Sequence, residues 1–191
     1  MRFDKEALLW DEKPRRVELA KAVANYAQKD CYNKKVLDFG CGTGLVSLEL
    51  DAKEILGVDL SCEMVKNFNQ KAQILGKNAK AICEDVNNVN KKFDIIVSSM
   101  VFHHIKDIQA MLKILSKKLN KNGKLFIADL YLEDGTFHDK GNEDVFHFGF
   151  EKNSFNSEYF ELLNFETIYS VKKHKYFDVC MWELKKNSII M

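Results

Sequence analysis

The sequence predicts an α/β fold, a doubly wound and mostly parallel sheet with helices on both faces and an antiparallel hairpin at its C-terminal end. Two observations lead to this prediction. From Lys35 onward, short apolar runs alternate with amphipathic helical stretches, which is typical of parallel strands joined by helical crossovers. Near the C-terminus, Phe165–Val171 and Tyr176–Leu184 lie too close together for a crossover helix, so we expect them to pair antiparallel.

The individual elements follow from periodicity. Pro14 suits the first turn of an N-terminal helix in which apolar residues recur at helical spacing. A last helix is expected at Ser154–Leu163, before the hairpin. The expected parallel strands are Lys35–Phe39, Glu54–Val58, Ala79–Cys83, Phe93–Ser98 and Lys124–Leu130. The apolar stripes of two further helices are Met64, Phe68, Ala72 and Leu75, and then Ile108, Met111, Leu112, Leu115 and Leu119.

The composition argues against a polyanionic partner. The net charge is +1, and no block of five or more like charges occurs in the 191 residues. We therefore expect a small-molecule partner, with no binding to nucleic acid or to a membrane. The five cysteines form no C-x-x-C pair, which predicts reduced thiols. No signal peptide or membrane span is recognisable, so we expect a cytoplasmic protein, and the oligomeric state is open.

The strongest local signal is the glycine-rich turn Gly40-Cys41-Gly42-Thr43-Gly44, which follows the first expected strand. We expect a helix to begin near Leu45. Glycines let the backbone turn tightly and approach a ligand, with free N–H groups facing the crevice. This context favours a nucleotide-type ligand over a turn that serves packing alone.

The acid before the turn indicates which ligand. Asp38 lies two residues before Gly40, where its carboxylate would repel a pyrophosphate and attract a cation. The site offers no Lys or Arg for a phosphate, and Leu45 stands where the dinucleotide fingerprint has its third glycine. S-adenosylmethionine carries an ammonium and a sulfonium and no phosphate, so it fits better than NAD. The alternative for Asp38 is a carboxylate that caps a turn.

Two further acids lie at strand ends. Asp59 ends the second strand, nineteen residues after Gly40 (59 − 40), where an acid accepts both ribose hydroxyls. Asp85 follows the third strand, within reach of an adenine amino group. The alternatives are helix capping for Asp59 and a ligand-free loop carboxylate for Asp85. Because the carboxyl ends of parallel strands share one crevice, the coincidence of three acids favours a binding site.

With these motifs the chain resembles the class I S-adenosylmethionine-dependent methyltransferases over nearly its whole length, and most closely a small-molecule subgroup similar to quinone-biosynthesis enzymes. The stretches VLDFGCGTG, GVDLS and CEDV resemble the family's cofactor motifs, and Phe93–Met100 its fourth-strand motif. The resemblance implies a Rossmann-like sheet of seven strands. We expect a single domain, 1–191, with an N-terminal helical cap (1–34), a cofactor-binding core (35–130) and a region of lid loop, helix and hairpin (131–191).

The resemblance also implies a cofactor role for each matching position. By this resemblance, Gly40, Cys41 and Gly42 contact the methionine portion, and Asp59 holds the ribose. The adenine is bound by Leu60, Met64, Asp85 and Val86, and the floor of the pocket is formed by Ser99 and Met100. Two stretches depart from the family pattern. The turn Asn120–Gly123 keeps one glycine, which Asn tolerates. Ser98–Val101 lacks the N/D-P-P-Y/F of enzymes that methylate base amines, which argues against nucleic-acid acceptors.

The acceptor side rests on histidines and aromatic residues. His103 and His104 follow strand four; we choose His104 as the candidate catalytic base, and the alternative is a structural histidine. The aromatic-rich loop Tyr131–Phe150 suits either a lid or a surface loop whose rings complete the core. No metal is expected, because the spacing of Glu133, Asp134, His138 and His147 matches no established site.

The N-terminal residues are candidates for covering the cofactor. Trp10 is expected in a lid over the methionine end, and Arg15 and Arg16 either bind its carboxylate or form surface salt bridges. The leading hypothesis is S-adenosylmethionine-dependent methyl transfer to a small-molecule acceptor, whose identity and acceptor atom are open. The alternatives are a non-catalytic S-adenosylmethionine-binding protein, acting as a sensor or partner subunit, and, less favoured, an NAD-dependent dehydrogenase.

Overall fold

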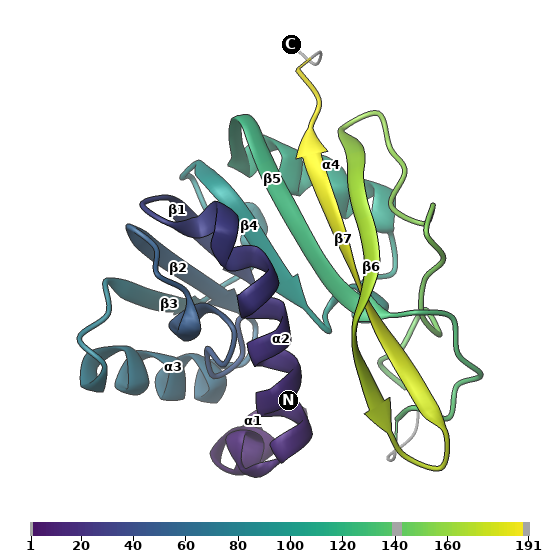
Figure 1. Cartoon of the computed structure of the whole chain (residues 1–191). Helices are drawn as coiled ribbons and strands as arrows, with labels where there is room; N and C mark the ends of the chain where they lie inside the picture. Colours follow the sequence, from purple (N-terminus) through teal and green to yellow (C-terminus); the bar gives the residue numbers. More distant parts are fainter. Residues whose placement is uncertain (1, 139–142, 189–191) are drawn as a thin grey trace.

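The computed structural model describes residues 2–138 and 143–188, and its sheet has seven strands in the order β3-β2-β1-β4-β5-β7-β6 (Figure 1). The first five strands pair in parallel, and β7 pairs antiparallel with both β5 and β6. The predicted doubly wound sheet with a terminal antiparallel hairpin is thereby confirmed. The strands are β1 (Lys35–Phe39), β2 (Glu54–Asp59), β3 (Ala79–Cys83), β4 (Phe93–Ser99), β5 (Leu119–Leu130), β6 (Phe160–Lys172) and β7 (Tyr176–Lys186).

Helices cover both faces of the sheet. The helix α2 (Pro14–Cys31), with its proline in the first turn as expected, packs with α3 (Cys62–Ile74) on one face, and α4 (Ile108–Lys118) packs on the other (Figure 1). The short helix α1 (Arg2–Glu6) and the 3-10 helix η1 (Ala7–Glu12) precede α2 and lie at the edge where β1, β2 and β4 end (Figure 1). Three further 3-10 helices are η2 (Ser47–Glu49), η3 (Val86–Asn88) and η4 (Phe102–His104).

The helix predicted at Ser154–Leu163 is wrong. Ser154 closes a turn with Glu151, and β6 begins at Phe160, opposite Lys186 near the end of the long strand β7. The ring of Phe155 is buried in an aromatic cluster with Trp182, at a centroid distance of 5.0 Å. Pairing with β7 and packing of single aromatic rings thus replace a helical apolar stripe on this face.

Two boundaries also differ from the expected ones. The glycine turn is followed by turns and η2, because only a short segment remains before β2 begins at Glu54, and the helix expected near Leu45 is therefore absent. Leu119, expected in the helical stripe, already pairs with Phe93 as the first residue of β5. The register shifts between Phe93 and Ile95, and Asn122 has a φ of 62°, so the expected turn is a bulged start of the strand.

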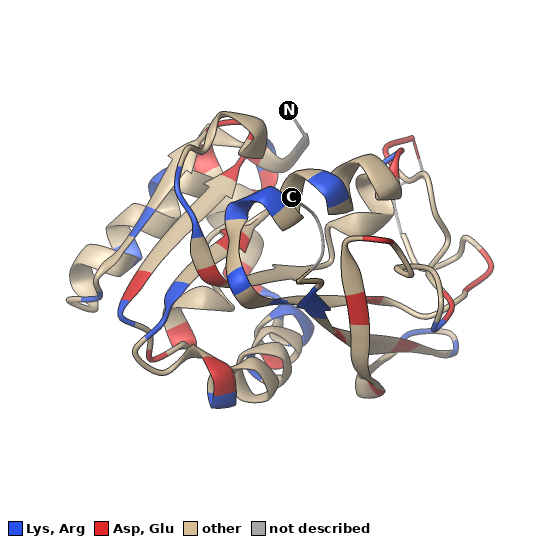
Figure 2. Cartoon of the chain, turned by 90° about the horizontal axis from the view of Figure 1, so that it is seen from above, with Lys and Arg blue, Asp and Glu red and all other residues tan. Residues whose placement is uncertain are grey.

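Charged residues of both signs are interspersed over the helices and strands (Figure 2). Within residues 2–138 and 143–188, no helix has the length and apolar character that a membrane crossing requires. The parallel register places Asp59 beside Cys83 at the ends of β2 and β3. The polar residues that follow β1, β2, β3 and β4 therefore meet at one edge, where the candidate site lies.

Candidate functional site

A cavity of about 560 Å³ lies at the carboxyl ends of β1–β4. All of the site residues predicted from the sequence line it except Asp38 and Cys41, which line an adjoining cavity of about 90 Å³. The two cavities share Arg16, Leu19, Gly40, Ser99 and Met100. The structure thus brings the predicted residues together at one place, and the role of each stays a prediction.

The glycine turn is shaped for close packing and offers few free donors. Gly40 has a φ of +73°, and a Cβ there would lie 2.3 Å from Val101 Cγ2, so only glycine fits. The N–H groups of Gly40 and Cys41 donate to Val58 O, that of Gly42 donates to Asp59, and that of Gly44 to Cys41 O. The expectation that free N–H groups face the crevice is therefore wrong for these four. Without those donors and without a following helix, the turn lacks the features that bind a pyrophosphate.

Asp38 is buried at the end of β1 with an incomplete set of partners. Its Oδ2 atom and Ser47 Oγ have no hydrogen-bond partner of regular geometry among the described residues. Burial raises the pKa of the Asp38 carboxyl to about 7, the neighbouring Ser47 hydroxyl opposes the rise, and the nearby Asp59 adds to it. A buried carboxylate without a partner is costly, and a bound cation is the group that would complete it. This observation fits the ammonium of S-adenosylmethionine.

Asp59 is held by the backbone at the cavity wall. Its Oδ2 accepts from Gly42 N and its Oδ1 from Ser61 N, both at 2.8 Å. Burial raises the pKa of Asp59, and these backbone hydrogen bonds oppose the rise. Ser61, and not Asp59, caps α3, by accepting from Met64 N. Each carboxylate oxygen keeps a further lone pair, so Asp59 can still accept two ribose hydroxyls.

The predicted adenine side is apolar with one polar edge. Leu60 is 58% exposed although it is apolar, and it lines the cavity together with the buried residues Met64 and Val86. An exposed leucine at a cavity mouth suits contact with the face of a flat ring. Asp85 accepts from Asn87 N and caps η3, so the capping function is present alongside its place at the cavity.

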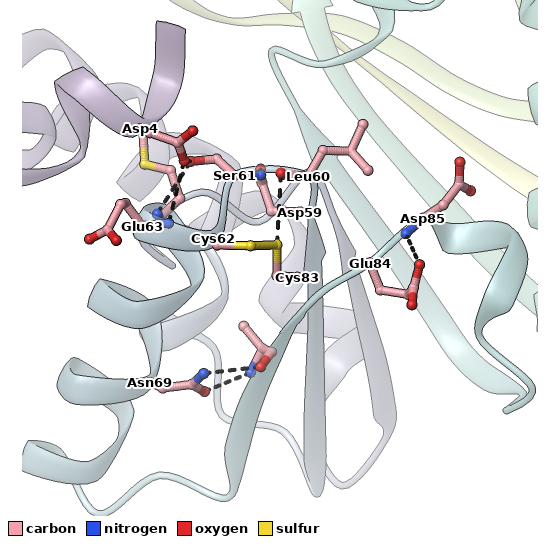
Figure 3. Close-up of a disulfide and its surroundings, with 12 residues drawn as sticks. Asp4, Asp59, Leu60, Ser61, Cys62, Glu63, Asn69, Cys83, Glu84 and Asp85 are labelled. Carbon is pink, nitrogen blue, oxygen red and sulfur yellow. Dashed lines mark hydrogen bonds between the residues drawn. A yellow bond between two sulfur atoms is a disulfide. The ribbon is translucent and has the colours of Figure 1, made fainter. Parts of the chain in front are cut away.

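A disulfide joins Cys62, the first residue of α3, to Cys83, the last residue of β3 (Figure 3). The prediction that all five thiols are reduced is therefore wrong for this pair. The pairing was hidden in the sequence because it depends on the parallel register of β2 and β3, which brings residues 21 positions apart next to each other. Cys31, Cys41 and Cys180 are free and buried.

The N-terminal segment packs on α3 and closes one side of the cavity. Ser61 Oγ donates to Asp4 at 2.6 Å, and Lys71 pairs with Asp11 at 2.6 Å. The Arg16 guanidinium lies 3.3 Å from the centroid of the Trp10 ring and pairs with Glu6 at 3.0 Å. Phe3, Trp10, Lys13, Arg15 and Arg16 line the cavity, so the expectation that the site lacks Lys and Arg is wrong.

The part of the cavity wall formed by η4 contains a buried pair that sequence reasoning missed. His103 Nδ1 lies 2.7 Å from Asp129 Oδ1, and His103 N donates to Asp129 Oδ2 at 3.2 Å. Both residues are buried, and His103 lines the cavity. Asp129 lies near the carboxyl end of β5, the same kind of position that singled out Asp59, and this signal was available in the sequence.

His104, the predicted catalytic base, lies beside this pair. Its ring centroid is 4.1 Å from that of His103, and its Nδ1 lies 2.6 Å from Asp144 O in the loop after β5. Burial lowers the pKa of His104, and the neighbouring His103 adds to this effect. His138 approaches His103 at 5.1 Å between centroids, so three imidazoles gather at one wall of the cavity.

The aromatic loop after β5 divides its side chains between the cavity and the core. Phe137 and Phe146 line the cavity, and Phe146 N donates to His103 O at 2.9 Å. Phe150 is buried against Phe155 and Trp182. Residues 139–142 of the predicted lid lie outside the described residues. Among the described residues, including those of this loop, no group of three or more His, Cys, Asp or Glu is arranged to hold a metal ion. Asp134 instead pairs with Lys175.

The structure is a doubly wound α/β fold with a cavity at the carboxyl edge of its parallel strands. The chain belongs to the methyltransferase-domain family, whose model matches residues 12–175. The resemblance to class I S-adenosylmethionine-dependent methyltransferases is confirmed, and S-adenosylmethionine is the cofactor. In fold, the chain is similar to an S-adenosylmethionine-dependent methyltransferase from Clostridium acetobutylicum, with a TM-score of 0.68, 18% identity and 96% of each chain covered.

Three curated relatives match about half of this chain. An uncharacterized methyltransferase of Schizosaccharomyces pombe is 40% identical over 116 residues, which cover 54% of this chain and 41% of the relative. A ubiquinone biosynthesis O-methyltransferase of Pelagibacter ubique is 34% identical, with 54% and 45% covered. A tRNA U34 carboxymethyltransferase of Campylobacter lari is 35% identical, with 53% and 37% covered. The matches thus span less than half of the length of each relative.

Proposed function

We propose that this chain transfers the methyl group of S-adenosylmethionine to a small molecule that carries an ionisable hydroxyl. The observation that carries the proposal is the single 560 Å³ cavity, which is lined both by the cofactor-motif residues and by His103 of the buried His103–Asp129 pair. S-adenosylmethionine supplies a sulfonium-bound methyl group for an in-line displacement. The protein has to hold both partners in line and exclude water.

The cofactor residues are assigned by their place and chemistry. Asp38 takes the ammonium, because its unpartnered Oδ2 needs a cation. Asp59 takes the ribose hydroxyls, and Leu60 and Met64 contact the adenine ring. Arg16 lies at both cavities and takes the carboxylate of the methionine portion. The turn residues Gly40, Cys41 and Gly42, the edge residues Asp85 and Val86, and the floor residues Ser99 and Met100 complete the pocket.

The small acceptor is supported by the way the cavity is covered. Phe3 and Trp10 come from the N-terminal segment, and Phe137 and Phe146 from the loop after β5, so aromatic rings from two segments line the cavity together with the cofactor-motif residues. A net charge of +1 also gives no general attraction to RNA. The ubiquinone O-methyltransferase among the relatives is in keeping with a small hydroxylated acceptor, and the tRNA enzyme supplies the competing acceptor class for the test.

We assign the proton transfer to His103 in place of His104. Asp129 accepts the Nδ1–H of His103, which leaves the lone pair on Nε2 to accept a proton from the acceptor. His104 has only a backbone carbonyl as the partner of its Nδ1 and contacts Phe3 at 5.8 Å between ring centroids. It is therefore assigned to the acceptor-binding wall.

Transfer of a labelled methyl group tests this proposal. The protein is incubated with methyl-labelled S-adenosylmethionine and either a panel of phenols and catechols or total tRNA. The expected result is label on a hydroxyl oxygen of a small aromatic acceptor. Label in tRNA alone would overturn the acceptor class. Tight binding of S-adenosylmethionine without transfer to any acceptor would support the non-catalytic alternative.

A further inference from the structure

We propose that the Cys62–Cys83 disulfide is a reversible redox site that sets the affinity of the adenosine end of the cofactor pocket. The inference rests on the proposed function only for the identity of the ligand. The two cysteines lie close in sequence to cavity-lining residues: Cys62 comes two residues after Leu60, and Cys83 comes directly before Glu84 and Asp85 (Figure 3).

The bond ties the two loops that form this end of the pocket. Asp59 is the last residue of β2, Leu60 begins the loop after it, Asp85 comes from the loop after β3, and all three line the cavity. The Cα atoms of the two cysteines are 5.0 Å apart. Neither cysteine lines the cavity. The disulfide therefore fixes the pocket wall from behind and does not contact the ligand.

Other bonds keep the two elements together when the disulfide is open. Glu84 N donates to Asp59 O at 3.0 Å, and the Asn69 side chain forms two hydrogen bonds with the backbone of Ala81 at 2.8 and 3.0 Å (Figure 3). Reduction should therefore loosen the loops without separating α3 from β3. A looser wall must be ordered when the ligand binds, which lowers the affinity.

A dithiol reductant is sufficient to open the disulfide, because Cys62 and Cys83 are exposed and can be reached from solvent. The three free cysteines are buried. A thiolate of the reductant attacks one sulfur and forms a mixed disulfide, and the sulfur it displaces takes up a proton. The second thiol of the reductant then forms its own disulfide and releases the other protein thiol. Two electrons and two protons pass to the protein.

The contact of Cys83 with Leu60 changes in the same step. Cys83 Sγ lies 3.8 Å from Leu60 O (Figure 3), and a disulfide sulfur has no proton to donate to that carbonyl. The reduced thiol of Cys83 has a proton that it can donate to Leu60 O. Reduction thus replaces a covalent tether between the two loops with a weak thiol contact at the residue that is assigned to the adenine face.

Calorimetric titration of S-adenosylhomocysteine into oxidised and dithiothreitol-reduced protein tests the inference. We expect the dissociation constant to rise by about five- to twentyfold on reduction. Alkylation in denaturant followed by mass spectrometry checks the redox state, with Cys31, Cys41 and Cys180 modified in the oxidised form and Cys62 and Cys83 in addition after reduction. The Cys62→Ser variant should bind S-adenosylhomocysteine as weakly as the reduced protein, and dithiothreitol should not change its dissociation constant. In the control variant Cys180→Ser, dithiothreitol should raise the dissociation constant as it does in the unmodified protein.

Linkage provides a second readout that needs no variant. If the oxidised form binds S-adenosylhomocysteine more tightly, saturating ligand must shift the equilibrium with dithiothreitol toward the disulfide by the same factor. A tenfold ratio corresponds to about 30 mV in the reduction potential. Equal affinity in the two redox forms would overturn this inference alone, as would alkylation of Cys62 and Cys83 after treatment with oxidised dithiothreitol. Failure of both forms to bind would overturn the proposed function and the inference with it.

Discussion

His103 Nδ1 and Asp129 Oδ1 lie 2.7 Å apart in a buried pair that joins η4 to β5, and His103 lines the cavity. Asp129 also accepts from the backbone N–H groups of His103 and Leu130. The carboxylate therefore has enough partners to stay in place without the ligand. An aspartate in this position fixes the tautomer and the orientation of an imidazole that accepts a proton.

Substituting the carboxylate tests this assignment. In Asp129→Asn, the amide can present a donor to Nδ1, which favours the wrong tautomer, so kcat should fall by about 10²–10⁴-fold. The affinity for S-adenosylhomocysteine should change by less than about twofold, because Asp129 does not line the cavity. Steady-state kinetics with the acceptor and calorimetry with the product measure the two effects. His103→Asn in the Asp129→Asn background should cause little further loss, since the two residues act as a unit.

The assignment of proton transfer to His103 would be wrong if His104→Asn, and not His103→Asn, caused the large loss of kcat. In that case the proton would pass to His104, which the sequence alone had favoured. A loss confined to KM in His104→Asn is the result expected for a residue of the binding wall.

Asp38 should make the ligand-free protein less stable as the pH rises. Its pKa is raised from 3.8 to about 7 by burial, so between these values the native state holds a proton that the unfolded state has lost. The free energy of unfolding therefore falls with rising pH across this window, by up to about 4 kcal/mol from this group. Urea unfolding at pH 5 and pH 8 measures the fall, and Asp38→Asn should remove this contribution. An identical pH dependence in the variant would contradict it.

The same residue should couple cofactor binding to pH. The ammonium of S-adenosylmethionine requires an ionised Asp38, so the affinity should increase as the pH rises through about 7. Asp38→Asn should bind the cofactor about 10- to 100-fold more weakly at pH 8, because a charge-assisted contact is lost. Calorimetry at pH 6, 7 and 8 compares the two proteins. The buried Asp38 carboxylate therefore lowers the stability of the ligand-free protein and at the same time provides the negative charge that binds the cation.

Asp59→Ala should weaken binding of S-adenosylhomocysteine by roughly 1.5–3 kcal/mol, through loss of the contact with the ribose. The change also frees the N–H groups of Gly42 and Ser61, so a urea unfolding curve must accompany the titration. Asp51→Ala is the matched control, because this exposed acid precedes β2 at the opposite end from Asp59. Unchanged affinity in a folded Asp59→Ala protein would refute the ribose assignment.

Gly40→Ala should destabilise the protein by about 2–4 kcal/mol, since the new Cβ would meet Val101 Cγ2 at 2.3 Å and the φ is +73°. Gly76→Ala separates the two causes. Gly76 has a φ of +61° and no atom within 4 Å of the added Cβ, so it should cost only about 1 kcal/mol. Urea unfolding of both variants gives the difference, and Val101→Ala should restore part of the loss in Gly40→Ala. Equal costs for the two glycines would rule out the steric contact as the reason.

The fold was predictable from the sequence wherever one physical signal dominated. Parallel strands are buried on both faces and read as continuous apolar runs, so β1–β4 could be located closely. The region after β5 could not, because Phe155 and Trp182 satisfy their burial through single ring contacts that leave no helical or alternating pattern. The missing helix after Gly44 depends on how few residues remain before β2, a constraint that periodicity does not contain.

Some residues of the candidate site were predictable from the sequence and others were not. The acids at the ends of β1 and β2 were found because parallel strands bring their carboxyl ends together. The cations Lys13, Arg15 and Arg16 lie at the start of α2, and only the packing of that helix on the sheet brings them to the cavity. The Cys62–Cys83 bond and the His103–Asp129 pair join residues distant in sequence, and their geometry appears only in the folded chain.

The central claim is that the cavity binds S-adenosylmethionine and not a dinucleotide. Titration calorimetry of the full chain with S-adenosylmethionine, S-adenosylhomocysteine and NAD tests it most directly. The structure predicts micromolar binding of the first two and none of NAD, because the N–H groups of Gly40, Cys41 and Gly42 are already bonded within the protein and Asp38 requires a cation. Binding of NAD without binding of either S-adenosyl compound would contradict the account.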